Sequence, residues 1–154
     1  MGPSAARALR ALRVAVLGAV IVTVTVWTNL WFGNGPALIE DGMVAAPTLP
    51  VGPVPLARDA ALASLSLIPP LWLLAAISGP WPMRLFSAAM LAAGWYWVGQ
   101  SVTSQFAGNF GTTWLPGEAF AELFYVPVLT PVLWFLAVAG YVWLTGRLGP
   151  APSH

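Results

Sequence analysis

The segments LIPPLWLLAA (67–76) and LTPVLWFLAV (129–138) share a leucine, a proline, a leucine, a tryptophan, a leucine and an alanine in the same order. Each lies inside a longer apolar run, residues 60–77 and residues 121–145. A helix needs about 20 residues to cross the roughly 30 Å hydrocarbon core of a bilayer. The two segments therefore predict two similar membrane-spanning helices, each interrupted by proline.

Two further apolar runs, residues 14–32 and 85–106, contain no charged side chain. Membrane β-strands alternate in polarity and are about half as long, so strands are excluded. The sequence predicts an all-α integral membrane protein, in which residues 1–154 form a single transmembrane domain. The predicted elements are four transmembrane helices, at 14–32, 60–77, 85–106 and 121–145, and two outer loops, at 33–59 and 107–120.

The composition indicates that lipid is the solvent of this chain. Of the 154 residues, 58% are hydrophobic and only 7% are charged, whereas soluble domains carry about 25% charged residues. The net charge of +1 argues against a nucleic-acid partner, because phosphate binding needs a dense basic surface. Cysteine is absent and the single histidine is His154, so we expect no cofactor or metal held by thiolate or imidazole within the membrane.

The charged residues predict how the helices are oriented. With four spans, one side carries arginines and the other carries every acidic residue together with Arg58. Loops that bear arginine remain in the cytoplasm, so both termini are predicted to be cytoplasmic. The cytoplasmic set is Arg7, Arg10, Arg13, Arg84 and Arg147, and the acidic set is Glu40, Asp41, Asp59, Glu118 and Glu122. Abundant alanine and the absence of lysine favour a bacterial protein, located in the inner membrane.

The repeated segment belongs to a weaker similarity between the two halves of the chain. Arg13 precedes the first apolar run as Arg84 precedes the third, and FGNG (32–35) and FAGNFG (106–111) end those runs. These matches predict two tandem helical hairpins that run in the same direction, a parallel pseudo-repeat. The alternative is chance similarity between leucine-rich segments.

Four prolines lie in or near the outer halves of the second and fourth predicted helices. Proline lacks an amide hydrogen and clashes with the carbonyl four residues earlier, so we expect helix kinks. Such kinks either expose carbonyls to an ion or substrate, or are static and relieved by a neighbouring serine hydroxyl. The predicted kinks are at Pro69, Pro70, Pro127 and Pro131. The segment VGPVPL (51–56) is predicted to be extended, because proline biases the preceding residue away from helix.

Polar side chains gather in the outer halves of the first and third predicted helices. Residues four apart share a helix face, which pairs Thr25 with Asn29 and Gln100 with Ser104. These side chains either line a polar vestibule open to the outer side or make hydrogen bonds between helices.

Four charged residues are expected at the outer interface: Arg58, Asp59, Glu118 and Glu122. Glu118 and Glu122 lie where the last helix begins, and carboxylates there interact favourably with the helix dipole. The alternatives are that the pair holds a cation or pairs with Arg58. Nothing else in the sequence supplies an acid–base partner in an enclosed pocket, so catalysis is not expected.

The segment GWYWVG (94–99) places aromatic residues near the centre of the third predicted helix. Trp95 and Trp97 are predicted either to pack against the proline-containing helices or to stack on a flat lipid-soluble ligand such as a quinone.

Motifs for phosphate binding, zinc hydrolysis and serine hydrolysis are absent from the sequence, which predicts a protein that is not an enzyme. We expect a non-catalytic subunit or assembly factor of a larger membrane complex, because the spans lack the ionisable residues that pumps and relays contain. The alternative is a small oligomeric transporter or channel that uses the polar vestibule. The predicted partners are membrane lipids together with other membrane subunits or further copies of the chain.

Overall fold

The computed structural model describes residues 3–35, 52–77, 82–108 and 113–147. These ranges are mostly helical and contain no strand, which confirms the all-α prediction. The segments are α1 (Pro3–Asn29), the π-helix η1 (Leu30–Asn34), α3 (Pro53–Leu65), α4 (Ile68–Ile77), α5 (Pro82–Ala107), α6 (Glu118–Leu123) and α7 (Leu129–Arg147). Much of the first predicted outer loop, with Glu40 and Asp41, lies outside the described residues.

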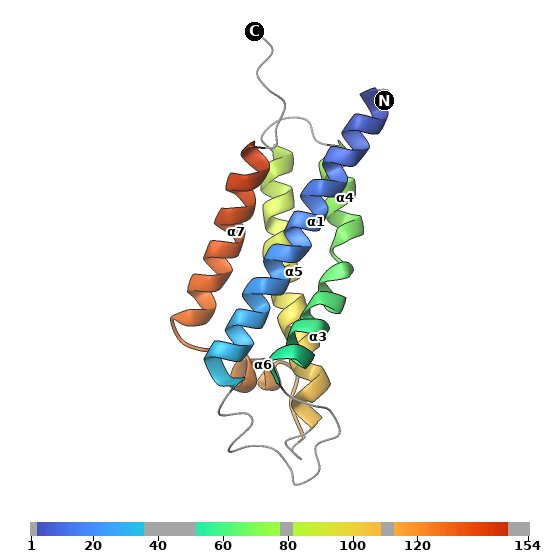
Figure 1. The fold of residues 1–154 in the computed structure, drawn as a ribbon. Helices are drawn as coiled ribbons and strands as arrows, with labels where there is room; N and C mark the ends of the chain where they lie inside the picture. The colour runs from blue at the N-terminus through green and yellow to red at the C-terminus, as the bar shows by residue number, and fades with distance from the viewer. Residues whose placement is uncertain (1–2, 36–51, 78–81, 109–112, 148–154) are drawn as a thin grey trace.

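The helices form a bundle along which the chain passes four times (Figure 1). Helix α1 makes the first pass, α3 and α4 the second, α5 the third, and α7 the fourth. The start of α1 and the end of α7 lie at the same end of the bundle, and α6 lies at the opposite end (Figure 1).

Two helices of the described chain are long and apolar enough to cross a membrane, Ser4–Gly33 and Leu129–Arg147. A third span results if α3 and α4, which are bent by 42° relative to each other, are counted together. Helix α5 has 26 residues but does not meet the same test of apolarity. The prediction of membrane-spanning helices is therefore confirmed for two or three of the four.

The second predicted helix, 60–77, is wrong as a single element. The structure has α3 and α4 with a break at Ser66 and Leu67, where the amide of Leu67 donates to the carbonyl of Ser64 at 3.0 Å. Pro69 and Pro70 fall in the first turn of α4, where an amide hydrogen is not needed. The prolines therefore begin a new helix and do not kink a continuous one.

The fourth predicted helix, 121–145, is broken for the same reason. Helix α6 ends at Leu123 and α7 begins at Leu129, with Pro127 in the intervening turn and Pro131 in the first turn of α7. Val128 in this turn has a φ of 73°, a left-handed conformation that is unfavourable for a β-branched residue.

Three other boundaries differ from the predictions. Helix α1 begins at Pro3 and so includes the arginines before residue 14. Helix α3 begins at Pro53, because proline is well accommodated at the first position of a helix, so the prediction of an extended chain through residue 56 is wrong. Helix α6 begins at Glu118, inside the second predicted loop. Helix α5, which has no internal proline, agrees with the prediction of 85–106 to within three residues.

The core of the bundle is built on small residues of α1. Ala15 and Gly18 are buried on this helix, and a Cβ atom added to Gly18 would lie 2.7 Å from Leu71 Cδ1, 3.1 Å from Tyr141 Cε2 and 3.2 Å from Leu91 Cδ1. Helices α1, α4, α5 and α7 therefore meet at Gly18. Small residues permit this close approach, as is usual between helices in membranes.

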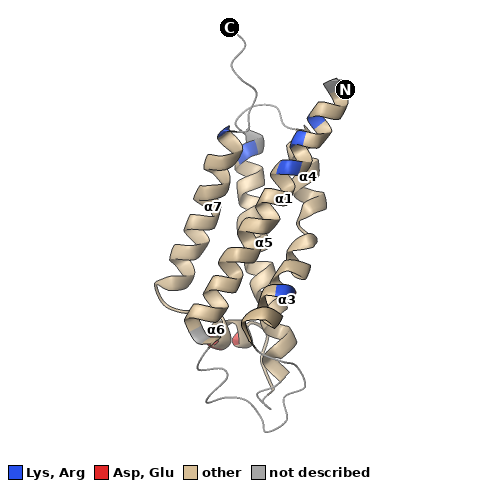
Figure 2. Cartoon of the chain, in the orientation of Figure 1, with Lys and Arg blue, Asp and Glu red and all other residues tan. Residues whose placement is uncertain are grey.

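Most charged residues lie toward the two ends of the bundle (Figure 2). The arginines of α1, α5 and α7 lie at the end where α1 begins and α7 ends, whereas α3 carries Arg58 nearer the other end (Figure 2). The described acidic residues are Asp59 on α3 and Glu118 and Glu122 on α6. The bundle thus has a basic end and a mixed, more acidic end.

Candidate functional site

A buried polar cluster joins α1 to the break between α6 and α7. Asn29 is fully buried, and its Nδ2 donates to the carbonyl oxygen of Phe124 at 2.8 Å. Its Oδ1 accepts from the hydroxyl of Thr130 at 2.9 Å, and that hydroxyl accepts from the amide of Val126 at 2.8 Å. Asn29 therefore joins α1 to Phe124 and Thr130, which lie 95 and 101 positions further along the chain.

The broken helix explains why polar side chains are needed at this place. Inside a helix, the carbonyl of Phe124 and the amide of Val126 would be satisfied by the continuing ladder. The turn at 124–128 ends the ladder, and unpaired backbone groups are costly in an apolar environment. Asn29 and Thr130 supply the missing partners, so this cluster stabilises the break.

A second interhelical hydrogen bond lies one turn earlier on α1. The indole Nε1 of Trp95, which is 2% exposed, donates to the hydroxyl oxygen of Thr25 at 2.9 Å. The same hydroxyl donates to the carbonyl of Ile21 at 2.7 Å. Thr25 thus connects α5 to α1 and satisfies a buried indole.

Aromatic rings pack against this hydrogen-bonded region. Trp95 meets Phe124 edge-on with ring centroids 5.2 Å apart, and Phe124 stacks on Phe120 at 4.6 Å. A Cβ atom added to Gly99 would lie 2.7 Å from Phe124 Cζ, so this glycine leaves room for the ring. Phe120 also packs against Tyr96 at 4.7 Å. The rings fix α6 against α5.

The four residues of the predicted vestibule do not converge. Asn29 and Thr25 make the buried interhelical contacts described above. Ser104 is exposed and donates to the carbonyl of Gln100 on its own helix at 2.8 Å. Gln100 is partly buried, and its Oε1 has no partner among the described residues.

The predicted outer charges are distributed along the surface. Arg58 Nε contacts the Oδ1 of its neighbour Asp59 at 3.0 Å, and the Arg58 side chain is 65% exposed. Glu118 accepts from the amide of Leu115 at 2.8 Å and so holds the turn that precedes α6. Glu122 is exposed. The structure therefore pairs Arg58 with Asp59, and the pairing of Arg58 with Glu118 or Glu122 is not observed.

The two tryptophans named for a flat ligand face different surroundings. Trp95 is packed in the core, whereas Trp97 is 48% exposed on another face of α5. The two rings therefore lie on different faces of α5, and the flat ligand stays a prediction.

Three more indoles donate across helix boundaries. Trp27 donates to the carbonyl of Pro53 at 2.9 Å. Trp72 on α4 donates to the carbonyl of Ala8 on α1 at 3.4 Å, and Trp134 on α7 donates to the carbonyl of Ala92 on α5 at 3.2 Å. Each carbonyl can accept twice, so an indole can bind it without breaking the helix. Trp72 and Trp134 are the matching tryptophans of the repeated segment.

The chemistry of these groups is hydrogen bonding and packing. Within the described residues, no group of three or more histidine, cysteine or acidic side chains is placed to hold a metal ion. Searches against protein-family models, curated proteins and solved structures find no match for this chain. The function is therefore inferred from the residues themselves.

Thr130 is the member of the buried cluster that sequence reasoning missed. It lies inside the quoted repeat, directly before Pro131, and the dipeptide Thr-Pro at the start of a helix was the available signal. Its partner Asn29 lies on another helix, so the sequence offered no way to join them.

Proposed function

We propose that this protein is a non-catalytic subunit or assembly factor of a larger membrane complex. The observation that carries the proposal is the use of the interior polar groups. Asn29, Thr25 and Trp95 make hydrogen bonds that join α1 to other parts of the bundle, and Asn29 and Trp95 are buried, so neither faces a path for a transported substrate. The outward surfaces of α4 and α7 are apolar, with exposed Leu73 and Phe135 among them. Such surfaces suit contact with lipid and with the helices of other subunits.

The proposed topology has four spans with both termini in the cytoplasm. Its support is the common end of the bundle at which α1 begins and α7 ends (Figure 1), and the arginines gathered there. Arginine-rich segments are retained on the cytoplasmic side. Helix α5 would be the least apolar span, compensated by its contacts with α1, α3, α4, α6 and α7. The composition favours the inner membrane of a bacterium.

The proposed origin is duplication of a helical hairpin. In the alignment of the repeated segments, Ile68 corresponds to Thr130, and α4 and α7 begin within one residue of equivalent positions. In both halves the matching tryptophan donates to a carbonyl of the first helix of its own hairpin, Ala8 for Trp72 and Ala92 for Trp134. The two contacts are alike in kind, but their acceptors are not at equivalent positions: Ala8 lies five residues before Arg13, and Ala92 lies eight residues after Arg84.

Site-specific photo-crosslinking followed by gentle detergent extraction tests the subunit role. Phe135 on α7 and Phe86 on α5 are 64% and 63% exposed, so a photoreactive residue at either position samples the surroundings equally well. A subunit should give a protein adduct with one larger membrane partner, concentrated on one of the two faces. Adducts with lipid or with the chain itself at both positions, and purification as a monomer or homo-oligomer, would contradict the proposal.

A small transporter or channel is the second candidate, favoured by one observation. Ser64 Oγ and Gln100 Oε1 are buried polar atoms without a partner among the described residues. Such atoms in native proteins commonly face water or a ligand. The variant Gln100→Leu should then abolish flux in liposomes while the protein remains folded, and unchanged flux would remove Gln100 from the mechanism.

A further inference from the structure

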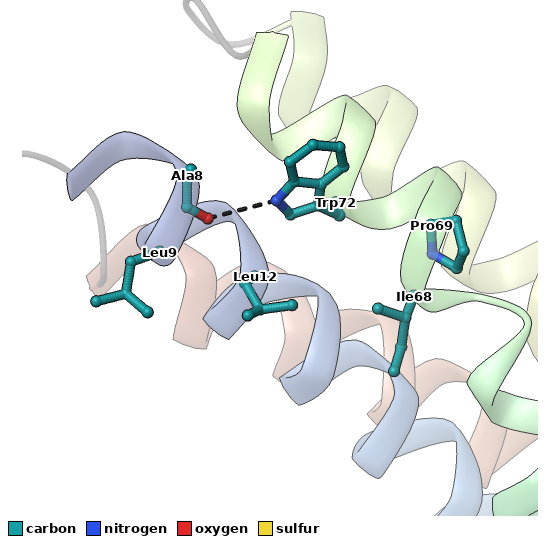
Figure 3. Close-up of a pocket in the computed structure, with 6 residues that line it drawn as sticks. All are labelled: Ala8, Leu9, Leu12, Ile68, Pro69 and Trp72. Carbon is teal, nitrogen blue, oxygen red and sulfur yellow. Dashed lines mark hydrogen bonds between the residues drawn. The ribbon is translucent and has the colours of Figure 1, made fainter. Parts of the chain in front are cut away.

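An apolar groove lies between α1 and α4 (Figure 3). Its volume is about 580 Å³, and it is lined by Ala8, Leu9, Leu12, Ile68, Pro69 and Trp72. The side chains of Leu9, Leu12 and Trp72 are 39%, 43% and 39% exposed, so the groove opens to the surroundings of the bundle. It lies near the basic end, because its α1 residues belong to the first turns of that helix.

The lining offers carbon surface and no free hydrogen-bonding side chain. The one polar side-chain atom, the indole nitrogen of Trp72, is already donating to the carbonyl of Ala8 at 3.4 Å (Figure 3). An occupant therefore gains from hydrocarbon contact, which points to an acyl chain or an aliphatic side chain.

The dimensions favour a thin occupant. The lining residues span positions 8–12 and 68–72, and four helical steps on each helix correspond to about 6 Å along the axis. A whole helix is about 10–12 Å wide and packs along several turns, so it would make contact with only a small part of its face. A flexible hydrocarbon chain fits a groove of this length.

Positive charge borders the groove on α1. Arg13 lies four residues after Leu9, and residues at this spacing are neighbours on a helix surface. Arg10 and Arg7 follow and precede lining residues by one position, so they project from other faces of α1. All three side chains are exposed, and none forms an ion pair within the described part of the chain. Arginine binds phosphate oxygens through paired hydrogen bonds.

We propose that this groove binds an anionic phospholipid, with one acyl chain between α1 and α4 and the headgroup phosphate on Arg13. The apolar lining and the neighbouring arginine match the two parts of such a molecule, and basic pockets between helices on the cytoplasmic side recognise anionic headgroups. The proposal requires insertion in a membrane but does not depend on the role in a larger complex.

The headgroup contact is tested with the purified full-length protein in detergent. Phosphatidylglycerol and phosphatidylcholine with identical acyl chains are added, and binding is followed by native mass spectrometry and by the shift in melting temperature. Phosphatidylglycerol should bind more tightly and raise the melting temperature more. The affinity should fall about fivefold for Arg13→Gln, and Arg10→Gln, on another face of α1, should lower it less. Arg58→Gln, at the other end of the bundle, is the matched control and should retain the preference.

The acyl-chain contact is tested with phosphatidylglycerol carrying brominated chains, which quench nearby tryptophan. The quenching is compared between the wild-type protein and Trp72→Phe. The part of the quenching that disappears in the variant comes from lipid in contact with Trp72. Ala8→Phe should fill the groove and reduce lipid retention, whereas Ala61→Phe, at another exposed alanine, should not. Equal binding of the two lipids, or no quenching at Trp72, would overturn the proposal. The proposal would also be overturned if a co-purified protein, and not lipid, covered Trp72 and kept the brominated chains from quenching it.

Discussion

Gly18 faces Leu71 so closely that no side chain fits between them, since an added Cβ atom would lie 2.7 Å from Leu71 Cδ1. The variant Gly18→Val should lower the free energy of unfolding by about 1–3 kcal/mol, because overpacking forces the four helices apart. The measurement is reversible unfolding by dodecyl sulfate in mixed micelles. Gly140→Val is the control, since Gly140 has open space around it. Equal losses of stability for Gly18→Val and Gly140→Val would contradict the close packing at Gly18.

Asn29 and Thr130 should behave as a coupled pair. Asn29→Leu leaves the Phe124 carbonyl without its side-chain donor, and we expect a loss of about 1–3 kcal/mol of stability. Thr130→Val should have a similar effect, and the double variant should cost less than the sum of the two. Ser104→Ala, at an exposed hydroxyl, serves as the control and should change stability by less than about 0.5 kcal/mol. Strictly additive losses would show that the two side chains do not act together.

Trp95 and Trp97 allow the same substitution to be compared on two faces of α5. Trp95→Phe removes the hydrogen bond to Thr25 and leaves a space in the core, so we expect a loss of about 2 kcal/mol. Trp97→Phe, at a half-exposed ring, should change the unfolding free energy by less than about 0.5 kcal/mol. A larger loss of stability for Trp97→Phe than for Trp95→Phe would contradict the burial of Trp95 in the core.

Val128 carries backbone strain that glycine would relieve. Its φ of 73° is unfavourable for a β-branched residue, and its side chain is 74% exposed, so little packing would be lost on truncation. We expect Val128→Gly to raise the unfolding free energy by about 1 kcal/mol. Val132→Gly, at an exposed residue inside α7, should instead destabilise the protein, because glycine is a poor helix former. A destabilised Val128→Gly variant would contradict the strained turn.

Both chain ends should report the same side of the membrane. A reporter that is active only in the cytoplasm is fused in turn to the amino and the carboxyl terminus, and both fusions should be active. Replacing Arg7, Arg10 and Arg13 with glutamine should lower the activity of the amino-terminal fusion, because these residues retain the start of the first helix in the cytoplasm. Activity from only one of the two wild-type fusions would exclude an even number of crossings.

The sequence was most informative where helices are long and uninterrupted. The bounds of α5 agree with the prediction because a continuous apolar run without internal proline leaves few alternatives to a helix. The sequence also predicts helix around Pro69 and Pro131, but as one bent helix in each run. Proline is equally compatible with a kink and with the first turn of a new helix, and only the path of the chain distinguishes them.

The buried cluster could be predicted only in part. The polarity of Asn29 indicated that it needs a partner within the membrane, yet the partner is a backbone carbonyl exposed by a break in a distant helix. The spacing of Gln100 and Ser104 correctly indicated neighbours on one helix, but it carried no information on which face of α5 meets α1. Contacts between helices depend on how they rotate against each other, which spacing within one helix does not determine.

The modest apolarity of α5 has a consequence for how the four-pass arrangement that we propose is made. A segment carrying Gly94, Gly99 and Gln100 gains little by entering lipid alone. Helices α1, α3 and α4 are synthesised before it and offer surfaces that cover its less apolar side. For that arrangement we expect insertion in chain order, with α1, α3 and α4 already in the membrane when α5 enters it.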